Sequence, residues 1–136
     1  MLEKYCGMID MLDKTIVDKH LRKALLNASR SLLKNKHGCV IFKDSQVLSV
    51  GHNKMINLWR LRHYGYNRTS LHAEADALIK ERRCFEGMCL LVVRLGKTKL
   101  RNSKPCKSCM AMIKEAGIST VFFSTQLGTI EEMVIS

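Results

Sequence analysis

The sequence has little proline, no long hydrophobic run and no signal-peptide pattern in its first residues. Its 136 residues include one proline, and no apolar stretch approaches the roughly 18 residues that a transmembrane helix needs. The first residues, Met1-Leu2-Glu3-Lys4, lack the charged and apolar regions of a signal peptide. A chain of this length is usually one domain with a substantial core. We therefore expect a single ordered domain over residues 1–136, located in the cytoplasm and without a membrane partner.

Acidic residues are also scarce. Twelve Asp and Glu stand against 23 Lys and Arg, which gives a net charge of +11. Three long stretches contain basic residues and no acid; they lie between Asp18 and Asp44, between Asp44 and Glu74, and between Glu86 and Glu115. Such a surface attracts a phosphorylated small molecule or a polynucleotide, although a basic surface also serves solubility alone. Charge by itself does not separate these interpretations.

Hydrophobic periodicity predicts alternating helices and strands. A capping box at Thr15 and Asp18 opens a helix whose apolar positions extend to Leu32. Two short β-prone runs follow as a hairpin, and two later helices are expected to begin directly after Ser70 and at Pro105. The predicted elements are a helix opened by Thr15 and closed at His37, strands 39–42 and 46–50, helix 71–83, strand 88–95, helix 105–116, and strands 120–124 and 129–135.

The last two strands are expected to pair antiparallel. Only about five residues link them, whereas a parallel crossover needs a dozen or more. The element order then favours a three-layer α/β/α domain built on a mixed sheet of about five strands.

Two short motifs carry the chemistry. His72-Ala73-Glu74 stands at the start of one predicted helix, and Pro105-Cys106-Lys107-Ser108-Cys109 stands at the start of the next. One imidazole and two thiolates suit Zn²⁺, and three protein ligands leave the fourth tetrahedral position for water, as in a catalytic site. His72, Cys106 and Cys109 are therefore the predicted zinc ligands, and Glu74 is the predicted catalytic proton carrier.

A structural zinc site is the alternative interpretation. It needs a fourth ligand, and Cys39, Cys84, Cys89 and His52 are the candidates. A structural site has no use for a carboxylate beside its ligand, so Glu74 favours catalysis. Six cysteines without a secretory leader also indicate a reducing compartment, in which thiols stay available to a metal.

Residues 51–70 interleave aromatic and basic side chains without a clear period. In one interpretation this segment is a surface loop that packs Trp59 against the core. In the other it is a lip over the site, where rings stack on bases and Arg60, Arg62 and Arg68 hold phosphate.

On these motifs and this element order, the chain resembles the cytidine/deoxycytidylate deaminase superfamily over about residues 15–135. The resemblance implies a cytidine-deaminase-like fold with Zn²⁺ as cofactor on His72, Cys106 and Cys109. It also implies hydrolytic deamination of a cytosine nucleoside or nucleotide to the uracil product by zinc-activated water, with Glu74 as the proton shuttle.

Further roles follow from the same resemblance. Asn53 matches the position of a sugar-contacting asparagine, and backbone amides near Ala73 and Cys106 would help to position the base. The expected partner is a small nucleoside or nucleotide substrate; deamination of cytosine in single-stranded DNA or RNA is the alternative. An inactive module that binds nucleic acid is the alternative from another class. Relatives that act on small molecules are commonly homo-oligomers, although this sequence does not itself give the oligomeric state.

The chain combines features of different subfamilies. Free-nucleoside cytidine deaminases share the antiparallel final strand pair but usually have cysteine at the position of His72. Deoxycytidylate, tRNA-adenosine and APOBEC/AID-like deaminases share the His-x-Glu form but generally insert a helix before a parallel last strand. Many adenosine and guanine deaminases have Thr-x-Glu before Pro-Cys, where this chain has Asn102-Ser103-Lys104. A purine substrate is therefore disfavoured.

Overall fold

The computed structural model describes residues 18–56, 64, 70–81 and 83–135, which contain three helices and six strands. In chain order these are α2 (Asp18–Ser29), β1 (Lys36–Lys43), β2 (Gln46–His52), α3 (Ala73–Lys80), β3 (Cys89–Leu95), β4 (Leu100–Arg101), α4 (Lys107–Glu115), β5 (Thr120–Ser124) and β6 (Ile130–Val134). The predicted order is confirmed, with β4 as an additional short strand. No helix in these ranges is both long and apolar enough to cross a membrane.

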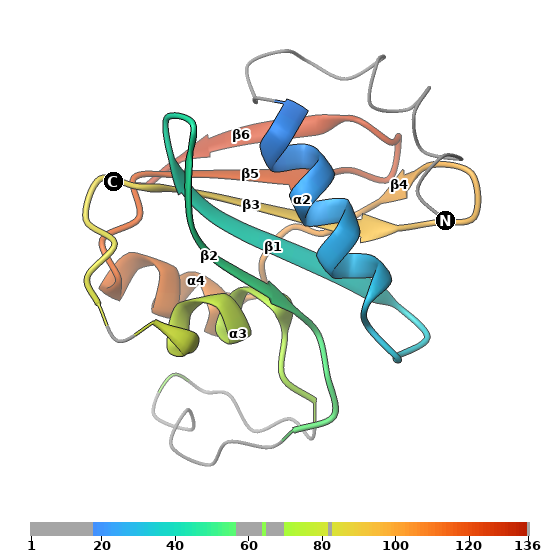
Figure 1. Ribbon diagram of the computed structural model, residues 1–136, viewed down its shortest axis with the longest axis horizontal. Coiled ribbons are helices and arrows are strands. Elements are labelled where there is room, and N and C mark those ends of the chain that lie inside the picture. Colours follow the sequence, from blue (N-terminus) through green and yellow to red (C-terminus); the bar gives the residue numbers. More distant parts are fainter. Residues whose placement is uncertain (1–17, 57–63, 65–69, 82, 136) are drawn as a thin grey trace.

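The strands form one mixed sheet in the order β2-β1-β3-β5-β6 (Figure 1). β1 pairs antiparallel with β2 and β3, and β3 pairs parallel with β5. β5 and β6 are antiparallel, as their short link predicted. β4 pairs with the end of β3, where Leu95 has Lys36 on one side and Leu100 on the other. The carboxyl ends of β2, β3 and β5 therefore lie at one end of the sheet, together with the start of β1.

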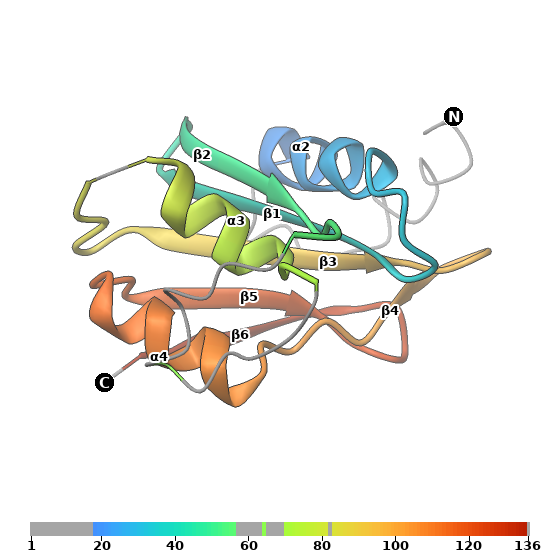
Figure 2. The same ribbon diagram turned by 90° about the horizontal axis from the view of Figure 1, so that it is seen from below.

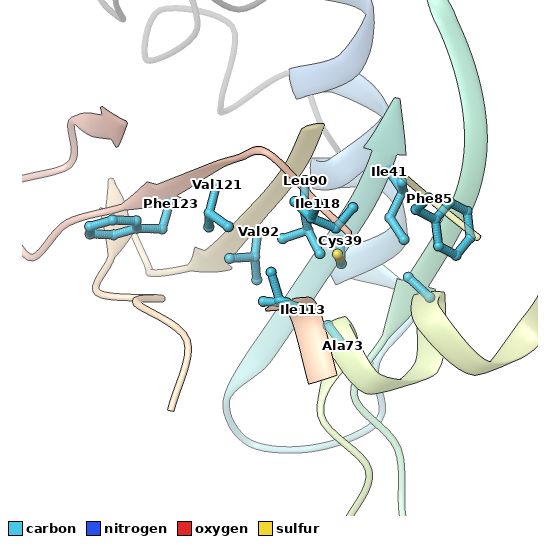
Figure 3. Close-up of a cluster of buried hydrophobic side chains, with 11 residues drawn as sticks. Cys39, Ile41, Ala73, Phe85, Leu90, Val92, Ile113, Ile118, Val121 and Phe123 are labelled. Carbon is cyan, nitrogen blue, oxygen red and sulfur yellow. The ribbon is translucent and has the colours of Figure 1, made fainter. Parts of the chain in front are cut away.

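Alternating side chains of the central strands build two apolar layers. Val40 and Leu91 face α2, whereas Cys39 and Leu90, their neighbours in the two strands, face α3 and α4. Figure 2 shows α3 in front of β1 and β2, and α4 in front of β5 and β6. Figure 3 shows the second layer, in which Ile113 of α4 meets side chains of β1, β3 and β5. Helices cover both faces of the sheet, so the three-layer prediction is confirmed.

The helix α2 ends earlier than its apolar pattern predicted. It stops at Ser29, and Leu32, which was expected to face the core, is 97% exposed. The reason is a contact with a distant segment: the Ser31 hydroxyl donates to the Asn53 carbonyl oxygen at 2.9 Å. This bond directs the chain out of the helix and across the end of the sheet into β1.

The helices α3 and α4 each begin two residues later than predicted. Leu71, the expected first residue of α3, instead exchanges two backbone hydrogen bonds with Lys54, of 2.7 and 3.1 Å. Pro105, the expected first residue of α4, is followed by Cys106, whose backbone is extended (φ −72°, ψ 170°). Each helix therefore starts directly after a candidate metal ligand.

Gly51 of β2 sets how closely α3 approaches the sheet. A Cβ atom there would lie 2.5 Å from the Ala73 carbonyl oxygen and 2.6 Å from the Ala77 backbone nitrogen. Since both are backbone atoms, Gly51→Ala has to push α3 outward. We expect a lower free energy of unfolding and, because His72 precedes Ala73, about tenfold weaker zinc binding. Competition with a chromophoric chelator measures the affinity.

Gly38 of β1 provides the matched control, because it packs against α2 on the opposite face of the sheet. A Cβ atom there would clash with backbone atoms of Ala24 and Ala28 in α2. Gly38→Ala is expected to destabilise the fold without changing the zinc affinity of the folded protein. Equal losses of zinc affinity in the two variants would contradict the role given to Gly51.

Candidate metal centre and active site

The two predicted metal motifs meet at the starts of α3 and α4. His72 is the N-cap residue of α3 and Cys106 is the N-cap residue of α4; neither makes a side-chain cap hydrogen bond. Cys109 follows in the first turn of α4. N-cap positions usually hold a residue whose oxygen accepts from the first helical N–H groups. Here those N–H groups and the helix dipoles favour negative charge on the neighbouring sulfur atoms.

The three side chains form one cluster. Nδ1 of His72 lies 3.6 Å from Sγ of Cys106 and 3.4 Å from Sγ of Cys109. All three ligand atoms lie within 4.8 Å of one another. With Zn–N bonds of about 2.0 Å and Zn–S bonds of about 2.3 Å, a tetrahedral ion has N···S edges of roughly 3.6 Å. The donor set and its separations therefore fit Zn²⁺.

The cluster offers three ligand atoms, one from each residue. Within the described ranges, no fourth His, Cys, Asp or Glu joins it. The residues considered for a structural site stand apart from it, namely Cys39, Cys84, Cys89 and His52. A tetrahedral ion on three protein ligands keeps one position for a non-protein ligand, which distinguishes a catalytic zinc from a structural one.

A cavity of about 350 Å³ adjoins the cluster. Its volume falls within the range of small-molecule sites, about 300–1,000 Å³. The lining comprises Leu33, Lys34, Asn35, His37, Asn53, Ser70, His72, Ala73, Glu74, Ser103, Lys104 and Cys106. Five of the predicted site residues thus line the cavity, namely Asn53, His72, Ala73, Glu74 and Cys106, and Cys109 of the cluster is buried.

Glu74 lines this cavity although it is only 4% exposed. Burial raises the pKa of its carboxyl to about 7, against the opposing effects of a backbone hydrogen bond and of His72. A group with a pKa near the working pH both accepts and releases protons readily. His72 and Glu74 are two residues apart and do not share a helix face, but both border the cavity because they stand at the very start of α3.

The two thiols have opposite tendencies. Hydrogen bonds with Cys109 and His72 lower the pKa of Cys106 to about 3. The same bond with Cys106, together with burial, raises the pKa of Cys109. One thiolate is therefore present at neutral pH, and binding of a divalent cation would release the second proton.

Asn53 lies in the cavity wall and holds it in place. Its Oδ1 accepts from the His37 backbone N–H at 2.9 Å, and its Nδ2 donates to the Asn35 carbonyl oxygen at 2.5 Å. One amide N–H and one lone pair of its side chain remain for other partners. Burial, Arg94 and His72 lower the pKa of His37 to about 4, so this imidazole is neutral at pH 7.

Asp76 shapes the site but was not identified from the sequence. It is 4% exposed, and its Oδ2 accepts from Nζ of Lys54, Nζ of Lys80 and the His52 backbone N–H, each at 3.1 Å. These contacts join the start of α3 to the end of β2. An acid two residues after Glu74, close to the predicted metal ligand His72, was the available signal.

Ser103 was missed as well. Its buried hydroxyl donates to the Val92 carbonyl oxygen at 2.8 Å, and it lies 2.7 Å from the Ser124 hydroxyl. The Ser124 backbone N–H in turn donates to it at 2.8 Å. This network fixes the segment that leads to Cys106. No local sequence signal predicts it, because its partners lie on other strands.

Arg60, Arg62 and Arg68 lie outside the described residues, as does Trp59. The structure therefore brings His72, Glu74, Cys106, Cys109, Ala73 and Asn53 together, and it does not locate the three predicted phosphate ligands.

Comparisons with known proteins identify a family with a zinc-binding region and several similar structures. A family model of the cytidine and deoxycytidylate deaminase zinc-binding region matches residues 14–125. The dCMP deaminase of cyanophage S-TIM5 in apo form has a TM-score of 0.58 and 24% identity, covering 82% of this chain and 91% of that chain. A structure of the same enzyme in complex with dCMP and dUMP has a TM-score of 0.58 and 22% identity, with 83% of each chain covered.

A cytidine deaminase from Burkholderia pseudomallei is similar in the same way. Its TM-score is 0.63 at 17% identity, covering 88% of this chain and 92% of that chain. At such identities the structural likeness shows a shared fold. A search of curated protein sequences found no match.

Proposed function

The chain belongs to the cytidine and deoxycytidylate deaminase family, and we propose on that basis that it deaminates a cytosine nucleoside or nucleotide by hydrolysis. The products would be the corresponding uracil compound and ammonia. One observation carries the proposal: Glu74 lines the same cavity as His72 and Cys106, beside a three-ligand cluster whose separations fit zinc. The family match supports zinc and deamination, while the choice of cytosine is our inference.

The chemistry divides between the metal and Glu74. Zinc on the cluster would supply a water nucleophile at neutral pH, because such an ion lowers the pKa of a bound water to about 7. Glu74 would accept a proton from the attacking water and deliver it to the ring nitrogen. It would then carry the second proton to the departing amino group, which leaves as ammonia. Water thus provides both protons, and one carboxyl group moves them in turn, a contribution of about 10²–10⁴ in rate.

The substrate contacts are proposed from the cavity lining. Asn53 has one side-chain N–H left for a sugar hydroxyl, and the backbone at Ala73 borders the cavity where a base would lie. Asn102-Ser103-Lys104 replaces the Thr-x-Glu common in purine deaminases, which favours a pyrimidine. Phosphate binding by Arg60, Arg62 and Arg68 stays a proposal from the sequence.

The cellular location is proposed from the thiols. The five cysteines within the described ranges are free, and free thiols are typical of a reducing compartment. This supports the cytoplasm as the place of action.

Ammonia release by the zinc-loaded protein tests the proposed function. The panel contains cytidine, deoxycytidine, CMP, dCMP and cytosine, with adenosine and guanosine as purine controls. We expect release from at least one cytosine monomer, accompanied by the uracil product, and none from the purines. Release from a purine alone would overturn the choice of cytosine. No release from any monomer would overturn the proposal of a monomer deaminase.

A further inference from the structure

The end of the sheet that carries the cavity also carries seven basic side chains, and we propose that this surface binds the phosphate backbone of a single-stranded nucleic acid. The basic rim consists of Lys34, Lys36, Arg94, Lys97, Lys99, Arg101 and Lys104. Lys34 and Lys104 line the cavity itself. The others extend from it over the start of β1 and along the β3–β4 hairpin, at the right of Figure 1.

Side-chain contacts make the rim continuous with the cavity. Nη2 of Arg94 donates to Oδ1 of Asn35 at 3.0 Å, and Asn35 belongs to the cavity lining. The side chain of Arg101 lies over the backbone of Gly96, where an added Cβ would be 3.0 Å from its Cγ. The basic side chains therefore extend from the cavity wall onto the β3–β4 hairpin as one continuous surface.

The rim places like charges together, and no acid among the described residues forms an ion pair with it. Arg94 and Arg101 stand directly opposite each other in the β3–β4 pair, an arrangement that destabilises a sheet. Within the described ranges, the ion pairs join Lys54 and Lys80 to Asp76, and none includes a rim residue. A stability cost of this kind is readily offset by a polyanionic partner.

Most of the described acidic residues lie away from the rim. Around the cavity, the described acids are the buried Glu74 and Asp76, while the exposed Glu131 and Glu132 stand on the outer strand β6, beyond β5. At the other end of the sheet, acids stand at the starts or ends of elements and in the β1–β2 turn, namely Asp18, Asp44, Glu81, Glu86 and Glu115. The resulting field draws a polyanion toward the cavity mouth.

The extent of the rim favours a strand over a single nucleotide. One terminal phosphate carries at most two negative charges, whereas seven cations continue well beyond the cavity. A polynucleotide offers one charge for every nucleotide along its backbone. The cavity beside the rim would admit only an unpaired base, because a duplex keeps its bases stacked. If the proposed function also holds, a cytosine of the bound strand would enter the cavity; backbone binding itself does not require this.

Fluorescence anisotropy with labelled oligonucleotides that contain no cytosine tests the rim. The probes are a 15-nucleotide oligo-dT and a 15-nucleotide oligo-rU, and the tighter of them identifies the preferred sugar. We expect binding at 50 mM salt that weakens about 50-fold at 200 mM salt, as four phosphate contacts on a single strand would give. Binding with no salt dependence would overturn backbone recognition.

A pair of charge reversals locates the binding surface. Lys97→Glu with Lys99→Glu is expected to weaken oligo-dT binding about tenfold or more. Lys43→Glu with Lys114→Glu changes the net charge equally at the opposite end of the sheet, on exposed residues, and is expected to weaken binding less than about threefold. Thermal unfolding confirms that both double variants are folded.

Three results would overturn the proposal. These are equal weakening by the two pairs, no binding at 50 mM salt, and equal affinity for a 15-base-pair duplex. Ammonia release from cytosine monomers tests the proposed function separately. A negative result for oligonucleotide binding therefore does not affect the proposal of monomer deamination. A negative result for ammonia release likewise does not affect the proposal that the rim binds nucleic acid.

Discussion

Glu74→Gln is expected to abolish turnover of cytosine substrates while the protein keeps one zinc ion per chain. The amide has nearly the shape of the carboxylate but cannot accept a proton from water or deliver one to the ring. Proton transfer of this kind is worth about 10²–10⁴ in rate, so kcat is expected to fall by at least that factor. Substrate loss measured by absorbance gives kcat, and a colorimetric chelator gives the zinc content.

Glu131→Gln is the matched control, because Glu131 is exposed on β6 and does not line the cavity. It makes the same chemical change and is expected to leave kcat unaltered. Loss of zinc in Glu74→Gln would mean that this carboxylate has a structural role at the cluster. Full activity in that variant would remove it from the mechanism.

Cys106→Ala and Cys109→Ala are each expected to lose zinc, activity and much of the thermal stability. Zinc binds the folded cluster and not the unfolded chain, so its binding free energy adds to the free energy of unfolding. With free zinc at about 1,000 times the dissociation constant, this contribution is about 4 kcal/mol. Calorimetry with and without a strong chelator measures it: the chelator should lower the Tm of the parent protein and have little effect on either variant.

Cys84→Ala tests the specificity of this effect. Cys84 is an exposed free thiol that stands apart from the cluster. This variant is expected to keep its zinc, its activity and the response of its Tm to chelator. If Cys106→Ala and Cys109→Ala both retained a full complement of zinc, the ligand assignment would be wrong.

The cluster of His72, Cys106 and Cys109 was predictable from the sequence because its chemistry is local. Spacings of two and three residues at helix starts bring His72, Cys106 and Cys109 to the ends of their elements, and the identity of the side chains selects the metal. The order of elements was predictable for a similar reason, since periodicity within one segment distinguishes a helix from a strand. The antiparallel last pair followed from the length of a single link.

The remaining details depend on partners distant in the sequence. The early end of α2 depends on a bond from Ser31 to Asn53, and the late start of α3 depends on the pairing of Leu71 with Lys54. The buried Asp76 depends on lysines from two different elements. The sequence of each segment gives no sign of these contacts. Periodicity and capping rules therefore predicted the end of α2 and the start of α3 two or more residues away from their observed positions.

The strand β6 has a further consequence for the behaviour of the protein at high concentration. As an outer strand of the sheet within the described ranges, it offers unpaired backbone groups to any other chain that approaches edge to edge. Glu131 and Glu132 are both exposed on this strand. A second copy docking there would bring like charges together, so this edge resists the indefinite sheet extension from which fibrillar aggregates grow.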